Sequence, residues 1–188
     1  MGMIQSFDAD AFRAINGAVY PVLDVVMPFI TNKGNFYGVI IFAVAVILIK
    51  ERKRGAQGLA LLIMAVLLSD FIANLLKHAV GRIRPCNAFD GVRLLVGCTE
   101  SFSFPSGHAA TIFTAMVFLS VRYRRYAPAF MAMAVSVAYS RVYVGVHYPL
   151  DTVGGALLGA SVAFVFAEAD RRYGGALFGR RVKTENEP

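Results

Sequence analysis

The amino-acid sequence predicts an all-α fold, a polytopic bundle of membrane-spanning helices in a single domain over residues 1–188. Two observations support this prediction. Apolar residues make up 57% of the 188 residues and the mean hydropathy is +0.57, whereas soluble domains contain roughly 45–50% apolar residues. The apolar residues also gather into segments close to the roughly 20 residues that a helix needs to cross a hydrocarbon core.

Five segments have the composition of membrane spans. In chain order they are Phe36–Ile49, Gln57–Leu76, His108–Val121, Ala127–Val146 and Pro149–Ala169. The first and third need flanking residues to reach across the bilayer. A sixth candidate, Phe12–Thr31, contains Arg13, Asp24 and two prolines, and we interpret it as an interfacial or re-entrant helix. We therefore predict five spans, or six if this candidate crosses, behind an N-terminal interfacial segment of residues 1–33.

Basic residues outside the motifs predict the orientation. They follow the first, third and fifth spans, the last group lying in a tail of residues 170–188. Cytoplasmic loops are enriched in Lys and Arg, so this side is predicted to be cytoplasmic and the loop of residues 77–107 to lie outside. The net charge of +7 would suggest nucleic-acid binding in a soluble protein. No such motif is present, and we attribute the charge to cytoplasmic loops and an anionic substrate.

Three motifs fall on the predicted outer face. They read KHAVGRIRP over residues 77–85, FPSGH over 104–108 and SRVYVGVHYPLD over 140–151. Lys77, Arg84 and Arg141 supply fixed positive charge, and arginine can bind phosphate oxygens through two hydrogen bonds. Ser106 and Gly107 lie where a helix is predicted to start, and its free backbone N–H groups favour an anion. The motifs thus predict a phosphate site.

The third motif adds a reactive pair. Pro149 suits the first turn of the last helix, which puts His147 just before that helix and Asp151 inside its first turn. A hydrogen bond between the two side chains would fix the imidazole tautomer and leave the other ring nitrogen free to attack.

Together the motifs resemble the signature of the type 2 phosphatidic acid phosphatase superfamily, K-x6-RP, PSGH and SR-x5-H-x3-D, at every fixed position. The resemblance implies that His147 is the nucleophile of a phosphohistidine intermediate, that Asp151 orients it, and that His108 is general acid and then base. Five residues would hold the phosphoryl oxygens: Lys77, Arg84, Ser106, Gly107 and Arg141. No metal or cofactor is implied, because the cations already supply electrostatic stabilisation.

The resemblance also implies a bacterial inner-membrane protein whose site faces the periplasm and whose substrate is a membrane lipid phosphate. Undecaprenyl diphosphate is our first candidate. Lipid A 1-phosphate, phosphatidylglycerol phosphate and phosphatidic acid are alternatives, as is a lipid phosphotransferase on the same scaffold. The oligomeric state is not predicted.

Two other interpretations of these residues fit the sequence less well. His78, His108 and His147 could bind zinc together, but their spacing is not that of a local metal motif. Ser106 lacks the G-x-S-x-G turn of a serine hydrolase.

Two further features concern the surroundings of the predicted site. Asp70, Asn74 and Lys77 share one helical stripe, which we expect to face the bundle interior as a hydrogen-bond network. Cys86 and Cys98 both lie in the outer loop, where we favour a disulfide over two free thiols, because the bacterial periplasm is oxidising.

Overall fold

The computed structural model describes residues 2–173, where the chain forms only helices and loops. The predicted basic tail lies outside the described residues from position 174 onward. The elements in chain order are α1 Met3–Gly17, α2 Pro21–Thr31, the 3-10 helix η1 Lys33–Phe36, α3 Tyr37–Val80, α4 Pro85–Ala88, α5 Gly107–Arg122, the 3-10 helix η2 Arg124–Tyr126, α6 Ala127–Tyr143 and α7 Pro149–Tyr173. The predicted all-α class is confirmed over this range.

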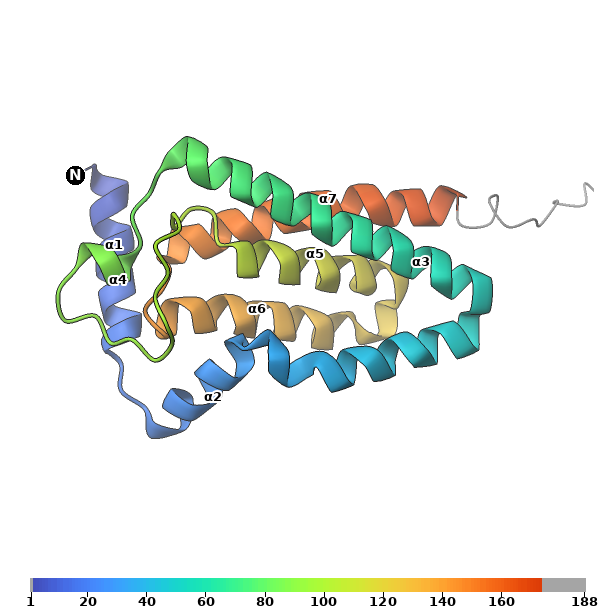
Figure 1. The fold of residues 1–188 in the computed structure, drawn as a ribbon, viewed down its shortest axis with the longest axis horizontal. Coiled ribbons are helices and arrows are strands. Elements are labelled where there is room, and N and C mark those ends of the chain that lie inside the picture. Colours follow the sequence, from blue (N-terminus) through green and yellow to red (C-terminus); the bar gives the residue numbers. More distant parts are fainter. Residues whose placement is uncertain (1, 174–188) are drawn as a thin grey trace, which may run out of the picture.

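Helix α3 consists of two arms joined by a sharp reversal. Arg52 has φ 51° and ψ −123°, which interrupts the helix, and Figure 1 shows the chain turning back at this point. A Cβ at Gly55 would lie 2.7 Å from the Ile47 carbonyl oxygen, so a glycine allows the two arms to approach closely. The first two predicted spans fall on the two arms.

The two arms of α3, together with α5, α6 and α7, run along the long axis of the molecule (Figure 1). Helices α5 and α7 touch most closely. An added Cβ at Gly155 would lie 2.4 Å from the Ser106 carbonyl oxygen, and one at Gly159 would lie 2.2 Å from that of Ala110. Small residues let membrane helices pack backbone to backbone, and this contact joins the starts of the two helices that carry the second and third motifs.

The outer surface of the bundle is apolar, as expected for a chain in a bilayer. Large side chains on the second arm of α3, such as Ile63, Leu67 and Phe71, are more than half exposed. By length and composition, two helical segments of the described chain can cross a membrane: Lys33–Ala88, which contains α3, and α7. Helices α1 and α2 form a further apolar pair bent by 113°. The number of crossings remains a prediction of five or six.

The polar stripe on α3 is less buried than predicted, although Asp70 does lie on the side that faces α5, where its Oδ1 would be 3.8 Å from a Cβ added at Gly107. Asp70 and Asn74 are exposed, and only Lys77 is buried. Asn74 Nδ2 does donate to Asp70 Oδ2 at 3.2 Å. On the second arm, the buried residues form a row spaced by four positions: Ala65, Ser69, Ala73 and Lys77. Small side chains in this row allow closer packing than an Asp and an Asn would.

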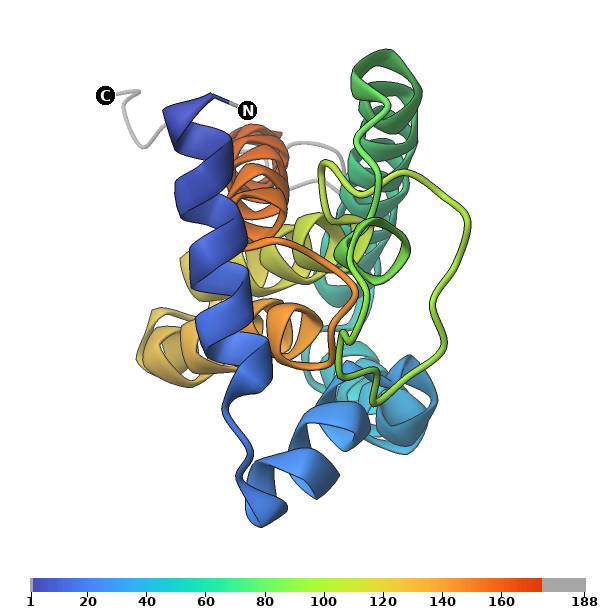
Figure 2. The same ribbon diagram turned by 90° about the vertical axis from the view of Figure 1, so that its left-hand side faces the viewer.

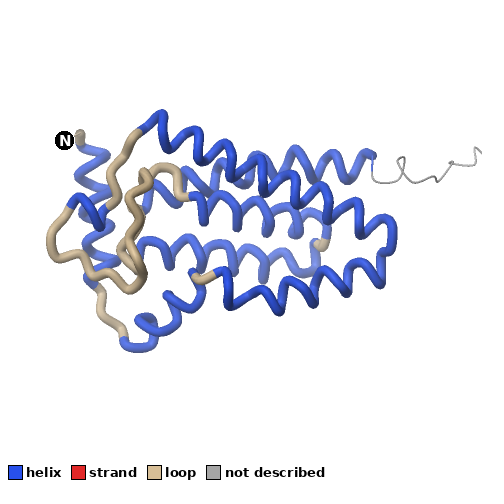
Figure 3. The backbone as a smooth tube through the Cα atoms, viewed as in Figure 1, coloured by secondary structure: helices blue, strands red, loops and turns tan. Residues whose placement is uncertain are grey.

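Most of the loop segments gather at one end of the bundle (Figure 3). Helix α1 lies across this end rather than along the bundle, and the long loop before α5 covers the other side of the same end (Figure 2). The reversal of α3, the α5–α6 connection and the end of α7, which carry the basic groups, lie at the opposite end (Figure 1). The three motifs and the basic groups therefore occupy opposite ends, as the sequence predicts.

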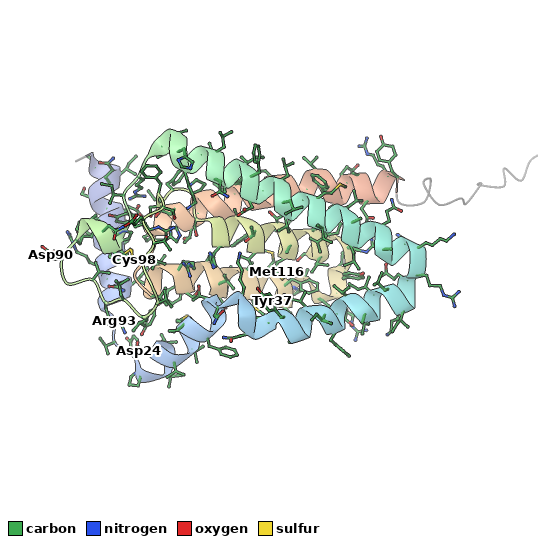
Figure 4. The ribbon with its side chains drawn as sticks, in the orientation of Figure 1. Asp24, Tyr37, Asp90, Arg93, Cys98 and Met116 are labelled. Atoms are coloured by element: carbon green, nitrogen blue, oxygen red, sulfur yellow. A yellow bond between two sulfur atoms is a disulfide. The ribbon has the colours of Figure 1, made fainter. Side chains whose placement is uncertain are left out.

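The outer loop is fastened at two points. A disulfide joins Cys86 and Cys98, whose Cα atoms are 6.4 Å apart. Arg93 Nη1 lies 2.5 Å from Asp24 Oδ1 of α2, and Figure 4 shows these two side chains close together beside the bundle end. The loop is thus held against both the first motif and the N-terminal segment.

Candidate active site

His147 lies in a tight turn between α6 and α7. Gly145 has φ 91°, and a Cβ there would lie 2.7 Å from the Arg93 carbonyl oxygen, so glycine is required for both conformation and space. The backbone N–H of His147 donates to the Arg141 carbonyl oxygen at 3.2 Å. The turn fixes the imidazole in a position where it is 1% exposed.

Asp151 is buried in the first turn of α7, as predicted. Its Oδ2 accepts from the Tyr148 backbone N–H at 2.9 Å and from the Ser103 hydroxyl, and lies 3.4 Å from His147 Nδ1. Its Oδ1 accepts from Arg82 Nη1 at 2.7 Å. These donors hold the carboxylate in its charged form, facing the imidazole.

Arg84 approaches the other side of the ring. Its Nη1 lies 3.3 Å from His147 Nε2, and its Nε donates to the Ser101 carbonyl oxygen at 2.7 Å. A guanidinium has only donors, so this contact suits an Nε2 that carries no proton. The ring proton then belongs on Nδ1, toward Asp151, and the lone pair of Nε2 points to the cation.

The electrostatic environment keeps His147 neutral. Burial lowers the pKa of His147 to about 4, the positive charge of Arg84 acts in the same direction, and Asp151 opposes both. At neutral pH the imidazole is therefore uncharged and able to act as a nucleophile.

Two further cations lie around this pair. Lys77 is buried at the end of α3 and donates from Nζ to the Phe102 carbonyl oxygen at 2.8 Å. Arg141 is buried near the end of α6 and donates to the Thr31 hydroxyl at 2.5 Å. Its Nε is buried and has no hydrogen-bond partner among the described residues. An unpaired buried donor is costly, and an anion bound beside it would remove that cost.

Helix α5 begins at this same place, as predicted. Ser106 is its N-cap residue, and its hydroxyl accepts from the Ala109 N–H at 3.5 Å. The Ser106 N–H donates to the Asp151 carbonyl oxygen at 2.9 Å, which joins the starts of α5 and α7. Gly107 lies near two side chains of α3, since an added Cβ would be 3.8 Å from Asp70 Oδ1 and 4.0 Å from Lys77 Cε. His108, the second residue of the helix, is partly exposed, and no hydrogen bond to its imidazole occurs within residues 2–173.

The structure thus gathers all eight predicted residues at one end of the bundle, and it adds four that sequence reasoning missed: Thr31, Arg82, Ser101 and Ser103. Arg82 lies inside the first motif at a variable position. The other three belong to no motif, and no sequence pattern could have found them.

The zinc interpretation finds no support in the arrangement. The His78 ring packs against Phe102, with ring centroids 5.7 Å apart, on the exposed side of α3. Within the described part of the chain, no group of three His, Cys, Asp or Glu side chains could hold a metal ion.

An apolar helix bundle that presents buried cations and a His–Asp pair at one end has the features of a membrane enzyme acting on phosphate groups. Comparison with known proteins agrees. The sequence profile of the PAP2 superfamily matches residues 58–173. The chain is 34% identical over 169 residues to an undecaprenyl-diphosphatase of Sulfolobus acidocaldarius, covering 87% of this chain and 79% of that one.

Two other relatives have different activities. A lipid A 1-phosphatase of Rhizobium johnstonii is 37% identical over 134 residues, covering 64% of this chain and 55% of that protein. The crystal structure of a PAP2 type phosphatidylglycerolphosphate phosphatase from Bacillus subtilis superposes with a TM-score of 0.75 at 26% identity, covering 91% of this chain and 88% of that one. The chain belongs to the PAP2 superfamily and is a membrane hydrolase of lipid phosphates.

Proposed function

We propose that this protein hydrolyses undecaprenyl diphosphate, without a metal ion, through a phosphohistidine on His147. The observation that carries the mechanism is the neutral, buried imidazole, whose Nδ1 faces Asp151 at 3.4 Å and whose Nε2 faces Arg84 at 3.3 Å. The similarity to the Sulfolobus acidocaldarius undecaprenyl-diphosphatase, which extends over most of both chains, favours this substrate.

In this mechanism the terminal phosphate binds among three cations, Lys77, Arg84 and Arg141, and at the start of α5. One of its oxygens accepts a hydrogen bond from Arg141 Nε, which has no partner among the described residues. Its oxygens also accept from free N–H groups at the helix N-terminus near Gly107. Fixed donors of this kind stabilise the charge that develops on the phosphoryl oxygens in the transition state.

The first step moves the phosphoryl group to the enzyme. The Nε2 lone pair of His147 forms a bond to phosphorus as the bond from phosphorus to the bridging oxygen breaks. His108 donates a proton to that oxygen, and undecaprenyl phosphate leaves. The imidazole ring is then positively charged, and Asp151 balances this charge through Nδ1–H.

The second step restores the enzyme. The now neutral His108 takes a proton from water as the water oxygen attacks phosphorus, and the bond from phosphorus to Nε2 breaks. Inorganic phosphate leaves, His147 is neutral again and His108 is protonated for the next cycle.

The site would face the outside of the cell. It lies at the end of the bundle opposite the basic groups, and basic groups mark the cytoplasmic side of membrane proteins. A multi-pass protein of the bacterial inner membrane would then receive its lipid from the outer leaflet, with the phosphate at the membrane surface.

The test is a phosphate-release assay on the purified protein in lipid vesicles. Undecaprenyl diphosphate is compared with lipid A 1-phosphate, phosphatidylglycerol phosphate and phosphatidic acid, because relatives act on the second and third of these. We expect the largest kcat/KM for undecaprenyl diphosphate, and a larger value for lipid A 1-phosphate would replace the substrate assignment. Transfer of labelled phosphate to a second lipid, rather than to water, would indicate a phosphotransferase.

The mechanism is tested by His147→Ala, with His78→Ala as the matched control. Loss of a nucleophile is expected to lower kcat by about 10³-fold or more. His78 lies on an exposed part of α3, so its replacement should leave the rate within about twofold. Full activity in His147→Ala would disprove the mechanism.

A further inference from the structure

One guanidinium bridges two buried carboxylates behind the His–Asp pair. Arg82 Nη1 lies 2.7 Å from Asp151 Oδ1, and Arg82 Nη2 lies 2.7 Å from Asp8 Oδ2. Asp8 is 1% exposed and belongs to α1. That helix lies outside residues 58–173, the part of the chain that the superfamily profile matches.

Both oxygens of Asp8 are used. While Oδ2 accepts from Arg82, Oδ1 accepts from the Leu150 backbone N–H in the first turn of α7 at 2.9 Å. The Tyr148 ring contacts both Arg82 and α1. Arg82 lies over the Tyr148 ring, 3.8 Å from its centroid, and Phe12 of α1 contacts the same ring at 5.6 Å between centroids. Helix α1 is therefore seated on the start of α7, with Asp8 directed at the ion pair.

The charges of this group explain why a second carboxylate is present. A single Arg82–Asp151 pair would be neutral, and the guanidinium would weaken the attraction of Asp151 for a positive imidazole. With Asp8 included, two carboxylates and one guanidinium carry a net charge of −1. In a buried site a net charge acts strongly on its neighbours, and the phosphohistidine step places one positive charge on the His147 ring.

We propose that Asp8 is a positioning residue of the reaction, which engages Arg82 so that the charge of Asp151 remains available to His147. This inference rests on the proposed function, because it assigns Asp8 a part in forming the phosphohistidine. Asp8 acts through Arg82 and touches neither the phosphate nor the reacting nitrogen.

The first test replaces Asp8 by its neutral isostere. In Asp8→Asn the amide oxygen can still accept from Leu150, while the net charge of the group becomes zero. Changes at the hydrogen-bonding partners of metal-bound histidines lower metal affinity or activity by roughly 10- to 100-fold. Because Asp8 acts on His147 in a similar, indirect way, we expect kcat to fall about tenfold. KM should stay within about twofold, because none of the phosphate-binding cations contacts Asp8.

The matched control is Asp10→Asn on the same helix. Asp10 is 71% exposed and pairs with Arg13 at 3.1 Å on the surface, so kcat should be unchanged. Thermal unfolding in detergent shows whether both variants are folded at the assay temperature. An Asp8→Asn variant that is folded and as active as Asp10→Asn would overturn the proposal.

A second variant separates a role in charge from a role in structure. Asp8→Asn combined with Arg82→Gln restores the net charge of −1, and we expect kcat to recover several-fold relative to Asp8→Asn alone. If Asp8 merely held α1 in place, removing a second partner would lower activity further. A double variant less active than Asp8→Asn would therefore overturn the proposal.

A readout that needs no turnover distinguishes this inference from the proposed function. The proton NMR resonance of His147 Nδ1–H reports how strongly Asp151 attracts this proton. We expect it to move upfield in Asp8→Asn and to stay in place in Asp10→Asn. If the wild-type protein releases phosphate from none of the four lipids, the proposed function fails, and an unchanged resonance would refute the role of Asp8.

Discussion

The contact between α5 and α7 can be tested by adding one methyl group. In Gly159→Ala the new Cβ would lie 2.2 Å from the Ala110 carbonyl oxygen and 2.9 Å from the Thr114 nitrogen. Both neighbours are helix backbone, so no flexible side chain can move aside. Relief requires the two helices to separate by about 1 Å, a gap that removes a quarter to a half of the dispersion energy of each affected contact.

Overpacking of this kind costs about 1–3 kcal/mol, and the backbone contact places Gly159→Ala near 2 kcal/mol or above. For a protein of this size, about 2 kcal/mol corresponds to a decrease in Tm of roughly 4–8 °C. The assay is thermal unfolding in detergent, followed by circular dichroism. The same substitution at Gly155 should also lower activity, because its clash is with the Ser106 carbonyl oxygen inside the site.

The control is Gly38→Ala, near the start of α3, where an added Cβ meets nothing within 4 Å. Alanine favours helix over glycine by about 1 kcal/mol, so this variant should be as stable as the wild type or slightly more stable. If Gly159→Ala unfolds at the wild-type temperature, α5 and α7 do not pack backbone to backbone, and the positioning of Ser106 against Asp151 needs another explanation.

Four more predictions follow from the site. The acidic limb of the pH profile of kcat/KM should lie near the His147 pKa of about 4, because activity is lost as protonation removes the nucleophilic lone pair; a limb at the ordinary histidine value of 6.5 would contradict the burial of the ring. Ser103→Ala removes a donor to Asp151 and should lower kcat by about tenfold, or roughly 1.4 kcal/mol, in the phosphate-release assay; an unchanged kcat would show that the hydroxyl is dispensable. Reduction of the Cys86–Cys98 disulfide should raise KM, because the bond anchors Cys98 only three residues before Ser101, the partner of Arg84; labelling with a thiol reagent should need prior reduction, and two reactive thiols without reductant would contradict the bond. EDTA should leave phosphate release unchanged, and loss of activity that Mg²⁺ restores would refute a metal-independent mechanism.

Much of the architecture could be predicted from composition and local pattern. Apolar runs separated by charged turns indicate membrane helices whatever their packing, and the all-helical class is confirmed. Local rules also placed two helix starts correctly. Ser106 caps α5, and Pro149 begins α7 with Asp151 in the first turn. Both depend on residues within four positions of one another, so the local residue preferences of helix starts are enough to predict them.

Side-chain direction was harder to predict. A stripe of polar residues on α3 suggested a buried network, yet Asp70 and Asn74 are exposed. Helical periodicity shows which residues share a face, but not which face the neighbouring helices will cover. Here the covered face is the one whose small side chains permit close packing, and it includes Lys77.

The sequence by itself determined the class of protein, because its three motifs have spacings that specify which residues a phosphate site would use. Only the tertiary structure decided what surrounds the nucleophile. Asp8 meets Arg82 across 74 residues of chain, and Arg82 meets Asp151 across a further 69. Contacts over such distances depend on how α1 lies across the bundle end and on how closely α5 approaches α7. They leave no periodic or local trace in the sequence, and they determine the charge that His147 experiences.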